Sequence, residues 1–428
     1  MIFSKEFYIG AATAAHQVEG NNIHSDYWAL EHMKTTSFAE PSLDAVDHYN
    51  RYEEDIRLMA DAGLNAYRFS IEWARIEPQE GVFDEQELEH YRAVIRCCKE
   101  HGIEPIVTLH HFTSPKWLIS KGGWEAETTP AYFARYAKYV MERLGSELKY
   151  VCTLNEANMG IQVAMIAQRY MQQMMAKMAA TKTDGTVQVG LNLEKMMAAR
   201  AQEGVQENMG VFGVPKAETF VSPRTAQGDM LVMEAHKAAR AVIREVAPHV
   251  KVGLTLSLHD IQAVPGGEEH AAKEWADEFT HYLPAIRNDD FLGVQNYSRA
   301  LIGPDGQLPA PEGAELTQMD YEFYPEGLEH VIRTVHQDFK GELMVTENGI
   351  ATADDTRRVA YIGTALEGVR KCIEDGIPVS GYCYRSLLDN FEWQKGFGMT
   401  FGLIAVDRST QTRYPKESLS FLGSFRGE

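Results

Sequence analysis

Short apolar segments alternate with longer amphipathic segments along most of the chain. Several of the short segments are apolar almost without interruption, which is typical of strands in a parallel sheet that helices cover. We predict eight such strands: Phe7–Thr13, Asn65–Ile71, Glu104–His110, Tyr150–Glu156, Lys251–Ser257, Asp290–Tyr297, Glu342–Glu347 and Val379–Arg385.

The longer segments have the periodicity of helices. Val46–Ala62 repeats apolar residues every three or four positions and is followed by Gly63, a typical helix stop. The other predicted helices are Glu85–Glu100, Pro130–Leu144, Ala235–Val246, Gly327–Phe339 and Arg357–Glu374.

This alternation over 428 residues predicts an α/β fold, a single (β/α)₈ or TIM barrel with enlarged βα loops. A doubly wound sheet is the alternative, but no Gly-rich turn follows the first strand. No low-complexity linker divides the chain, so we expect residues 1–428 to form one domain.

Methionine is concentrated in one segment, Met159–Met209, which holds half of the 18 methionines. Methionine adapts to irregular apolar shapes. We favour an extra helical layer that packs on the barrel. A pliable apolar lid over a pocket is the alternative.

Charge and cysteine content narrow the range of partners and compartments. Lys+Arg 41 against Asp+Glu 61 gives a net charge of −20, which disfavours nucleic acid and anionic membranes as partners.

The five cysteines have no paired spacing, so reduced thiols are expected. No apolar stretch approaches 18 residues and no secretion signal is evident, so we expect a cytoplasmic protein. The sequence is compatible with a homo-oligomer.

In a barrel of this kind, the active site forms at the carboxyl ends of the strands. The polar and aromatic residues there, or in the loops that follow, are Gln17, Arg68, His110, His111, Asn155, Glu156, Asn296, Tyr297, Glu347, Arg385, Glu392 and Trp393.

Glu156 and Glu347 end the fourth and seventh predicted strands, so they should face each other across the barrel mouth. Two carboxyl groups about 5–5.5 Å apart suit retaining glycoside hydrolysis. Arg68 would keep Glu347 ionised and Tyr297 would orient it, while Glu156 would keep its proton as the acid.

The remaining rim residues form a plausible sugar-binding set. Gln17, His111, Asn155 and Glu392 provide hydrogen-bonding groups for hydroxyls, and Trp393 provides an apolar face. His110 and His111 should point in opposite directions, because side chains alternate along a strand. We expect no metal site, since no metal-ligand spacing accompanies them.

Seven segments carry a resemblance to a known family: FYIGAATAAHQVEG, YRFSIEWARIEP, TLHHFTSPKWL, TLNEAN, DFLGVQNYSR, VTENGIA and SLLDNFEW. In content and order they resemble the landmarks of glycoside hydrolase family 1, which contains retaining β-glucosidases and β-galactosidases. The resemblance runs from Phe7 to about Pro415 and weakens between Ile161 and Asp229, so residues 159–229 are a divergent segment.

The resemblance implies a (β/α)₈ catalytic domain without a cofactor. It implies Glu156 as acid/base and Glu347 as nucleophile, with Arg68 and Tyr297 tuning the nucleophile. The glycone would be held by Gln17, His111, Asn155, Glu392 and Trp393.

The chain departs from the family pattern at four positions. Ala157 replaces a Pro and Phe112 replaces a Trp, both mild changes. Arg385 stands where the family usually has the Trp on which the glycone stacks, and Lys395 stands where Glu is common. Arg385 can still stack and adds donors and a charge.

Two interpretations of Arg385 are open. The basic glycone end would favour an acidic or otherwise modified sugar, or Arg385 simply pairs with a neighbouring acid. A 6-phosphorylated sugar is disfavoured, because that branch of the family tends to have Ser at the position of Glu392.

We therefore expect a β-glycosidase whose partner is a small glycoside or oligosaccharide. The rewritten methionine-rich segment predicts an apolar or small aglycone. A transglycosidase with the same covalent intermediate and a non-catalytic carbohydrate-binding protein on this scaffold are the alternative functions.

Overall fold

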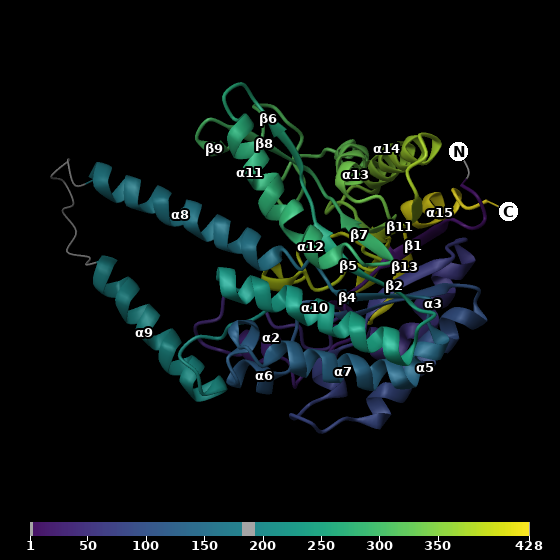
Figure 1. Ribbon diagram of the computed structural model, residues 1–428, viewed down its shortest axis with the longest axis horizontal. Helices are drawn as coiled ribbons and strands as arrows, with labels where there is room; N and C mark the ends of the chain where they lie inside the picture. Colours follow the sequence, from purple (N-terminus) through teal and green to yellow (C-terminus); the bar gives the residue numbers. More distant parts are fainter. Residues whose placement is uncertain (1–2, 182–192, 428) are drawn as a thin grey trace.

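The computed structural model describes residues 3–181 and 193–427. Eight parallel strands close into a barrel in the order β1-β11-β10-β7-β5-β4-β3-β2 (Figure 1). This confirms the predicted (β/α)₈ barrel. The strands are β1 (Tyr8–Ala12), β2 (Ala66–Ser70), β3 (Glu104–His110), β4 (Tyr150–Leu154), β5 (Lys251–Ser257), β7 (Phe291–Gln295), β10 (Glu342–Asn348) and β11 (Val379–Arg385).

All eight predicted strands are present, and all but two of their ends lie within about one residue of the prediction. β4 ends at Leu154 and β7 at Gln295, both earlier than predicted. Glu156 has φ +45°, a left-handed conformation that an extended strand does not contain. The chain therefore turns away from β4 where Asn155 and Glu156 reach the barrel rim.

All six predicted helices are present around the barrel. They are α3 (His48–Asp61), α5 (Glu85–Glu100), α7 (Thr129–Leu144), α10 (Ala226–Val246), α13 (Gly327–Asp338) and α14 (Asp355–Glu374). α10 begins well before the predicted Ala235 because Thr225 caps it, accepting a hydrogen bond from the Gly228 N–H at 3.0 Å.

Shorter elements fill the enlarged loops, and we did not predict them. The helices are α1 (Ala15–Val18), α2 (Asp26–Glu31), α4 (Trp73–Ile76), α6 (Lys116–Ser120), α11 (Glu268–Glu278), α12 (Leu283–Ile286) and α15 (Glu417–Gly423), with 3₁₀ turns at Gly123–Glu125, Gly145–Glu147, Thr280–Tyr282 and Trp393–Lys395. Two small sheets are formed by β6 (Asp260–Ala263), β8 (Arg299–Gly303) and β9 (Gly306–Gln307), and by β12 (Ile404–Asp407) and β13 (Thr412–Pro415).

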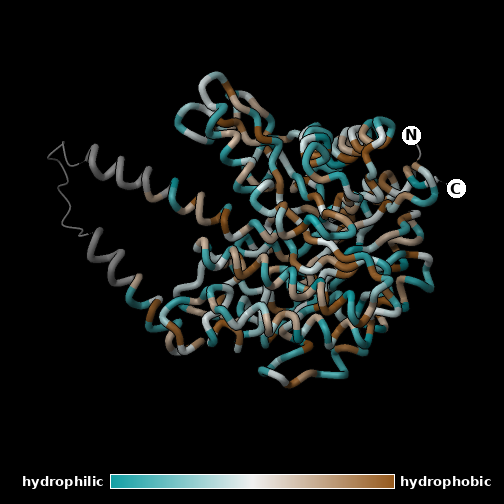
Figure 2. Tube along the Cα trace, in the orientation of Figure 1, coloured by the Kyte–Doolittle hydropathy of each residue, from teal (hydrophilic) through white to brown (hydrophobic). Residues whose placement is uncertain are grey.

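Hydrophobic residues gather along the barrel strands, whereas the surrounding helices contain both hydrophobic and hydrophilic residues (Figure 2). One buried cluster draws residues from seven of the eight strands: Ala12, Ala66, Ile106, Tyr150, Cys152, Phe291, Met344 and Cys383. Small residues are needed where strands approach closely. A Cβ on Gly10 would lie 2.3 Å from the Ala66 carbonyl oxygen.

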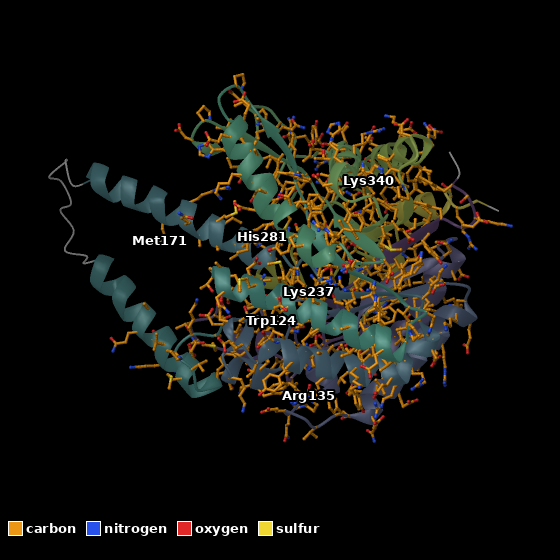
Figure 3. All side chains as sticks on the ribbon, viewed as in Figure 1. Trp124, Arg135, Met171, Lys237, His281 and Lys340 are labelled. Carbon is orange, nitrogen blue, oxygen red and sulfur yellow. The ribbon has the colours of Figure 1, made fainter. Side chains whose placement is uncertain are left out.

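The methionine-rich segment forms α8 (Met159–Thr181) and α9 (Leu193–Phe212). Both helices extend away from the barrel, and Met171 lies on the projecting part of α8 (Figures 1 and 3). α8 contacts α11 and α9 contacts α6. The expected helical layer on the barrel is therefore wrong for the described residues. In the part of the chain described, no helix has the length and apolar character needed to cross a bilayer.

Candidate active site

A pocket of about 430 Å³ opens at the carboxyl ends of the strands. Asn155 and Glu156 reach it from the end of β4, Glu347 from β10, and Arg385 from the last position of β11. Residues almost two hundred positions apart thus share one cavity. The barrel brings both candidate carboxylates to that cavity.

Two neighbours hold the Glu347 carboxylate. Arg68 on β2 is fully buried and donates to one carboxylate oxygen at 2.6 Å. The Tyr297 hydroxyl donates to the other oxygen. Burial first, and then the charge of Glu347, raise the pKa of Tyr297 well above its usual value, so the hydroxyl keeps its proton and remains a donor. These contacts stabilise the ionised form of Glu347 and fix its direction.

A hydrogen-bond chain orients Asn155 and His111. Arg68 donates to Asn155 Oδ1 at 2.6 Å, and Gln295 donates to the same oxygen at 2.7 Å. The Asn155 amide nitrogen therefore donates to His111 Nε2 at 3.0 Å. Burial, and then the charge of Arg68, lower the pKa of His111 well below its usual value. A neutral His111 that accepts at Nε2 carries its proton on Nδ1.

Glu156 has different surroundings. Its backbone N–H donates to Thr255 Oγ1 at 2.9 Å, which holds the left-handed turn. Among the described residues, no side chain forms a hydrogen bond or ion pair with its carboxyl group. Burial, and then the charge of Glu347, raise the pKa of Glu156 to about 8. The carboxyl group is therefore protonated at neutral pH, as a general acid must be.

Arg385 is ion-paired inside the pocket. Its guanidinium donates to Glu392 and, at 3.2 Å, to Gln17 Oε1. The Gln17 amide nitrogen donates to the Phe391 carbonyl at 2.8 Å and to Glu392 at 3.2 Å. The guanidinium also lies 4.3 Å from the centre of the Phe401 ring. Of the two interpretations of Arg385, pairing with a neighbouring acid describes this geometry.

Aromatic residues form another wall of the pocket. Trp393 is half-buried and lies 5.1 Å from Phe112 and 5.8 Å from His111, measured between ring centres. Tyr27 packs edge-on against Trp393 at 5.6 Å. These rings provide flat apolar surfaces next to the hydrogen-bonding groups, as a pyranose ring requires.

The structure separates the two adjacent histidines as expected. His110 points away from the pocket, where its Nε2 and Ser114 Oγ are 3.0 Å apart and Trp124 packs against its ring. Lys395 is exposed and does not line the pocket, so our expectation that it makes the glycone end more basic is wrong. The described residues contain no group of three His, Cys, Asp or Glu side chains arranged for a metal ion.

Sequence reasoning missed several residues that line the pocket. His259 follows β5, and its Nδ1 lies 2.8 Å from Glu278 on α11. The Glu278 charge is the main cause that raises the pKa of His259. Tyr321 and Phe401 come from loops far beyond strand ends. His259 could have been found, because it stands two residues beyond a predicted strand end.

This barrel, with two buried carboxyl groups of different character at its carboxyl-terminal rim, is the architecture of a barrel glycosidase. Comparison with known proteins gives the family. The model of "Glycosyl hydrolase family 1" matches residues 1–427. A β-glucosidase of Agrobacterium sp. (strain ATCC 21400) is 31% identical, with 97% of this chain and 93% of that protein covered.

Solved structures agree with this assignment. The crystal structure of β-glycosidase BGL167 matches with a TM-score of 0.86 at 48% identity, covering 99% of this chain and 96% of that one. The apo structure of a β-glucosidase 1317 matches with a TM-score of 0.85 at 42% identity, covering 98% and 97%. The chain belongs to glycosyl hydrolase family 1 and is a glycosidase, which confirms the resemblance seen in the sequence.

Proposed function

We propose that the protein hydrolyses a terminal β-linked sugar by double displacement, with Glu347 as nucleophile and Glu156 as acid/base. The observation that carries this proposal is the contrast between the two carboxyl groups. Arg68 and Tyr297 stabilise a charged Glu347, whereas buried Glu156 has a raised pKa and keeps its proton. Paired carboxyl groups with separated pKa values divide the acid and nucleophile roles.

In the first step, a Glu347 oxygen attacks the anomeric carbon, and the bond to the leaving oxygen breaks. Glu156 gives its proton to that oxygen, so the aglycone leaves as a neutral alcohol. The product is an ester between the sugar and Glu347. Arg68 and Tyr297 do not transfer protons in this step; they hold the carboxylate in line with the anomeric carbon.

Esterification removes the charge of Glu347, the second cause of the raised pKa of Glu156. The pKa of Glu156 then falls, and its carboxylate can take a proton from water. That water attacks the anomeric carbon, the ester bond breaks, and Glu347 leaves as a carboxylate. The configuration at the anomeric carbon is retained.

We further propose a neutral, glucoside-like glycone. The charge of Arg385 is balanced by Glu392, so the pair provides hydrogen bonds and little net charge. A uronate or phosphate would meet the Glu392 carboxylate beside Arg385. Gln17, His111 and Asn155 add donors and acceptors for hydroxyls, and Trp393 supports the ring.

The apolar side chains in the pocket wall favour an apolar or small aglycone. Phe112, Met159, Val163 and Val221 line the pocket together with the ion-paired Arg299. A cytoplasmic setting fits the five cysteines, all of which are buried free thiols.

The test is a panel of aryl β-glycosides on the wild type, Glu156→Gln and Glu347→Gln, with and without azide. We expect Glu347→Gln to be inactive on all substrates. Glu156→Gln should retain activity on substrates with a good leaving group and be accelerated by azide, which forms the β-glycosyl azide without a base. If azide does not accelerate Glu156→Gln, Glu156 is not the acid/base.

A further inference from the structure

A histidine and a glutamate form a pair beside the proposed acid/base residue. His259 lines the same pocket as Glu156, and Glu278 is the last residue of α11. One carboxylate oxygen of Glu278 accepts a hydrogen bond from the His259 backbone N–H at 3.0 Å, and the other lies 2.8 Å from Nδ1 of the ring. No described residue bonds to Nε2. The buried carboxylate therefore holds a proton on Nδ1, and Nε2 can take a second proton without losing a contact.

One asparagine ties this pair to the turn that carries Glu156. Asn158 Nδ2 donates to the Ser257 carbonyl at 2.7 Å and to the Glu278 carbonyl at 2.9 Å, and Asn158 Oδ1 accepts from the Ser257 N–H at 3.0 Å. Asn158 is fully buried and stands two residues after Glu156. The end of β5, the end of α11 and the Glu156 turn thus form one hydrogen-bonded frame. This frame fixes the position of His259 relative to Glu156.

The charges around this pair favour the imidazolium form of His259. The charge of Glu278 is the main cause that raises the pKa of His259; burial opposes it, and Glu274 and Glu156 add to it. The other charged side chains near the pair are themselves ion-paired: Glu274 with Arg169 of α8, Arg299 of β8 with Glu322, and Asp260 of β6 with His330 of α13. Glu278 is thus the group that chiefly determines the charge of His259.

The two proposed chemical steps place opposite demands on Glu156. The first step needs its proton, and the second needs a carboxylate that accepts a proton from water. Esterification of Glu347 removes one cause of the raised pKa of Glu156, but burial, the larger cause, remains. A carboxylate in a buried site is stabilised by a nearby positive charge. The second step therefore depends on the cations that surround Glu156.

These cations are of two kinds. The pKa of Glu156 is lowered by Arg385, Arg68 and His259. The two arginines are each paired with another carboxylate that lines the pocket. His259 differs from them, because its charge depends on Glu278, which lies outside the pocket lining. The charge of His259 can thus be changed from behind the pocket wall, without altering the groups proposed to hold the sugar.

We propose that Glu278 and His259 are positioning residues for the acid/base: Glu278 holds a protonated His259 in the pocket wall, and this charge stabilises the Glu156 carboxylate when it acts as base in the second step. The inference rests on the proposed function and adds two residues to it. The pair transfers no proton in either step, because Nδ1–H stays bonded to Glu278 and the imidazolium acts through its charge. Loss of that charge should therefore favour the protonated form of Glu156 in both steps.

The test is Glu278→Gln, which keeps the size of the side chain and removes the charge that holds His259 protonated. With phenyl β-glucoside, which needs an acid, the basic limb of kcat/KM should move to higher pH by about 0.5 pH unit or more. With dinitrophenyl β-glucoside the leaving group departs readily, so hydrolysis of the ester should limit kcat. The acidic limb of this kcat should also move to higher pH, and kcat below that limb should fall about threefold or more.

Two further variants distinguish a loss of charge from a general disturbance of the fold. Asp277→Asn is the matched control, because Asp277 precedes Glu278 in α11 and pairs with Lys273. It should leave both limbs at the wild-type pH. Adding His259→Lys to Glu278→Gln supplies a positive charge that needs no partner, and should return both limbs toward the wild-type pH. Circular dichroism should be the same for all of these variants.

An NMR titration of labelled histidines needs no turnover and separates this inference from the proposed mechanism. The His259 signal is assigned by its loss in His259→Gln. We expect its midpoint to lie above that of an ordinary histidine in the wild type and to fall in Glu278→Gln. The inference is overturned if the wild-type midpoint is not raised, or if it falls in Glu278→Gln while both limbs stay in place. A basic limb that survives in Glu156→Gln would instead overturn the proposed function, and this inference with it.

Discussion

The guanidinium of Arg385 donates a hydrogen bond to the carboxylate of Glu392 within the pocket that holds the two candidate catalytic carboxyl groups. Both side chains are buried, and the pair replaces a lone positive charge with a nearly neutral hydrogen-bonding surface. We therefore propose that the ion pair sets how the pocket distinguishes neutral from acidic sugars.

Breaking this pair should change sugar selectivity. Glu392→Gln leaves the Arg385 charge unbalanced, so kcat/KM for p-nitrophenyl β-glucuronide relative to the β-glucoside should rise at least about tenfold. Activity on the glucoside should fall, because the carboxylate no longer binds its hydroxyls. The measurement is kcat/KM of both substrates at one pH.

Lys395→Gln is the control for charge alone, because Lys395 is exposed outside the pocket. We expect it to leave the ratio unchanged. If the wild type already prefers the glucuronide, then Arg385 recognises a sugar acid despite Glu392, and the neutral-glycone proposal is wrong.

The pH dependence of kcat/KM should report the protonation of Glu156. Burial and the charge of Glu347 raise its pKa to about 8, so the acid form is present below that pH. Activity should fall as the pH rises through this value. In Glu156→Gln, measured with a dinitrophenyl glycoside that needs no acid, this basic limb should disappear. A basic limb unchanged in the variant would assign it to another group.

His259 allows a finer test of the same limb. Glu278 raises the pKa of His259 and so favours its charged form, and that form lowers the pKa of Glu156. His259→Gln should therefore move the basic limb to higher pH. His330→Gln is the control, because His330 pairs with Asp260 outside the pocket. A limb that does not move in His259→Gln would show that the two groups are not coupled.

Tyr297→Phe should slow formation of the glycosyl-enzyme. The change removes one hydrogen bond to the charged Glu347 and leaves the ring in place. Hydrogen bonds to charged groups contribute about 1.5–3 kcal/mol, so kcat/KM should fall by about 10–100-fold. The loss should persist with dinitrophenyl leaving groups, because the nucleophile and not the acid is affected. Tyr414→Phe, at an exposed site, should behave as the wild type.

The barrel could be predicted from sequence because the spacing of apolar residues within each segment identifies it as a strand or a helix. The strands are apolar runs that helices cover, and helices such as α5 carry an apolar face together with a capping residue, Asp84. The small sheet of β6, β8 and β9 could not be predicted, because short strands in loops gain their order from pairing with each other. The β6 strand pairs with β8, which is distant in sequence.

The methionine-rich segment was misjudged for a related reason. Apolar residues occur on several sides of α8, so its sequence indicates a helix but not which face is covered.

At the active site, the positions of residues at the predicted strand ends placed Glu156, Glu347 and Arg68 together. The same reasoning could not decide whether Arg385 is free or paired. Glu392 contacts Arg385 because of the turn that follows β11, and the local sequence does not determine the geometry of that turn.

The same dependence on distant partners governs stability, and Arg413 provides the test. It donates to both oxygens of Asp55 on α3, at 2.8 and 2.9 Å, and all three groups of the Arg413–Asp55–His48 network are buried. Arg413→Met should lower the free energy of unfolding by about 3–5 kcal/mol, measured by urea denaturation at pH 7. Arg408→Met removes an exposed pair between Asp44 and Arg408, which lies in the same hairpin as Arg413, and should cost less than about 1 kcal/mol.

Burial alone would raise the pKa of Asp55, but hydrogen bonds from Arg413 and His48 lower it below its usual value. The contribution of ionised Asp55 to the free energy of unfolding is therefore complete above about pH 4 and is lost as the pH falls further. The difference in free energy of unfolding between the wild type and Arg413→Met should then shrink in acid. A difference that grows in acid would show that the ion pair does not stabilise the fold.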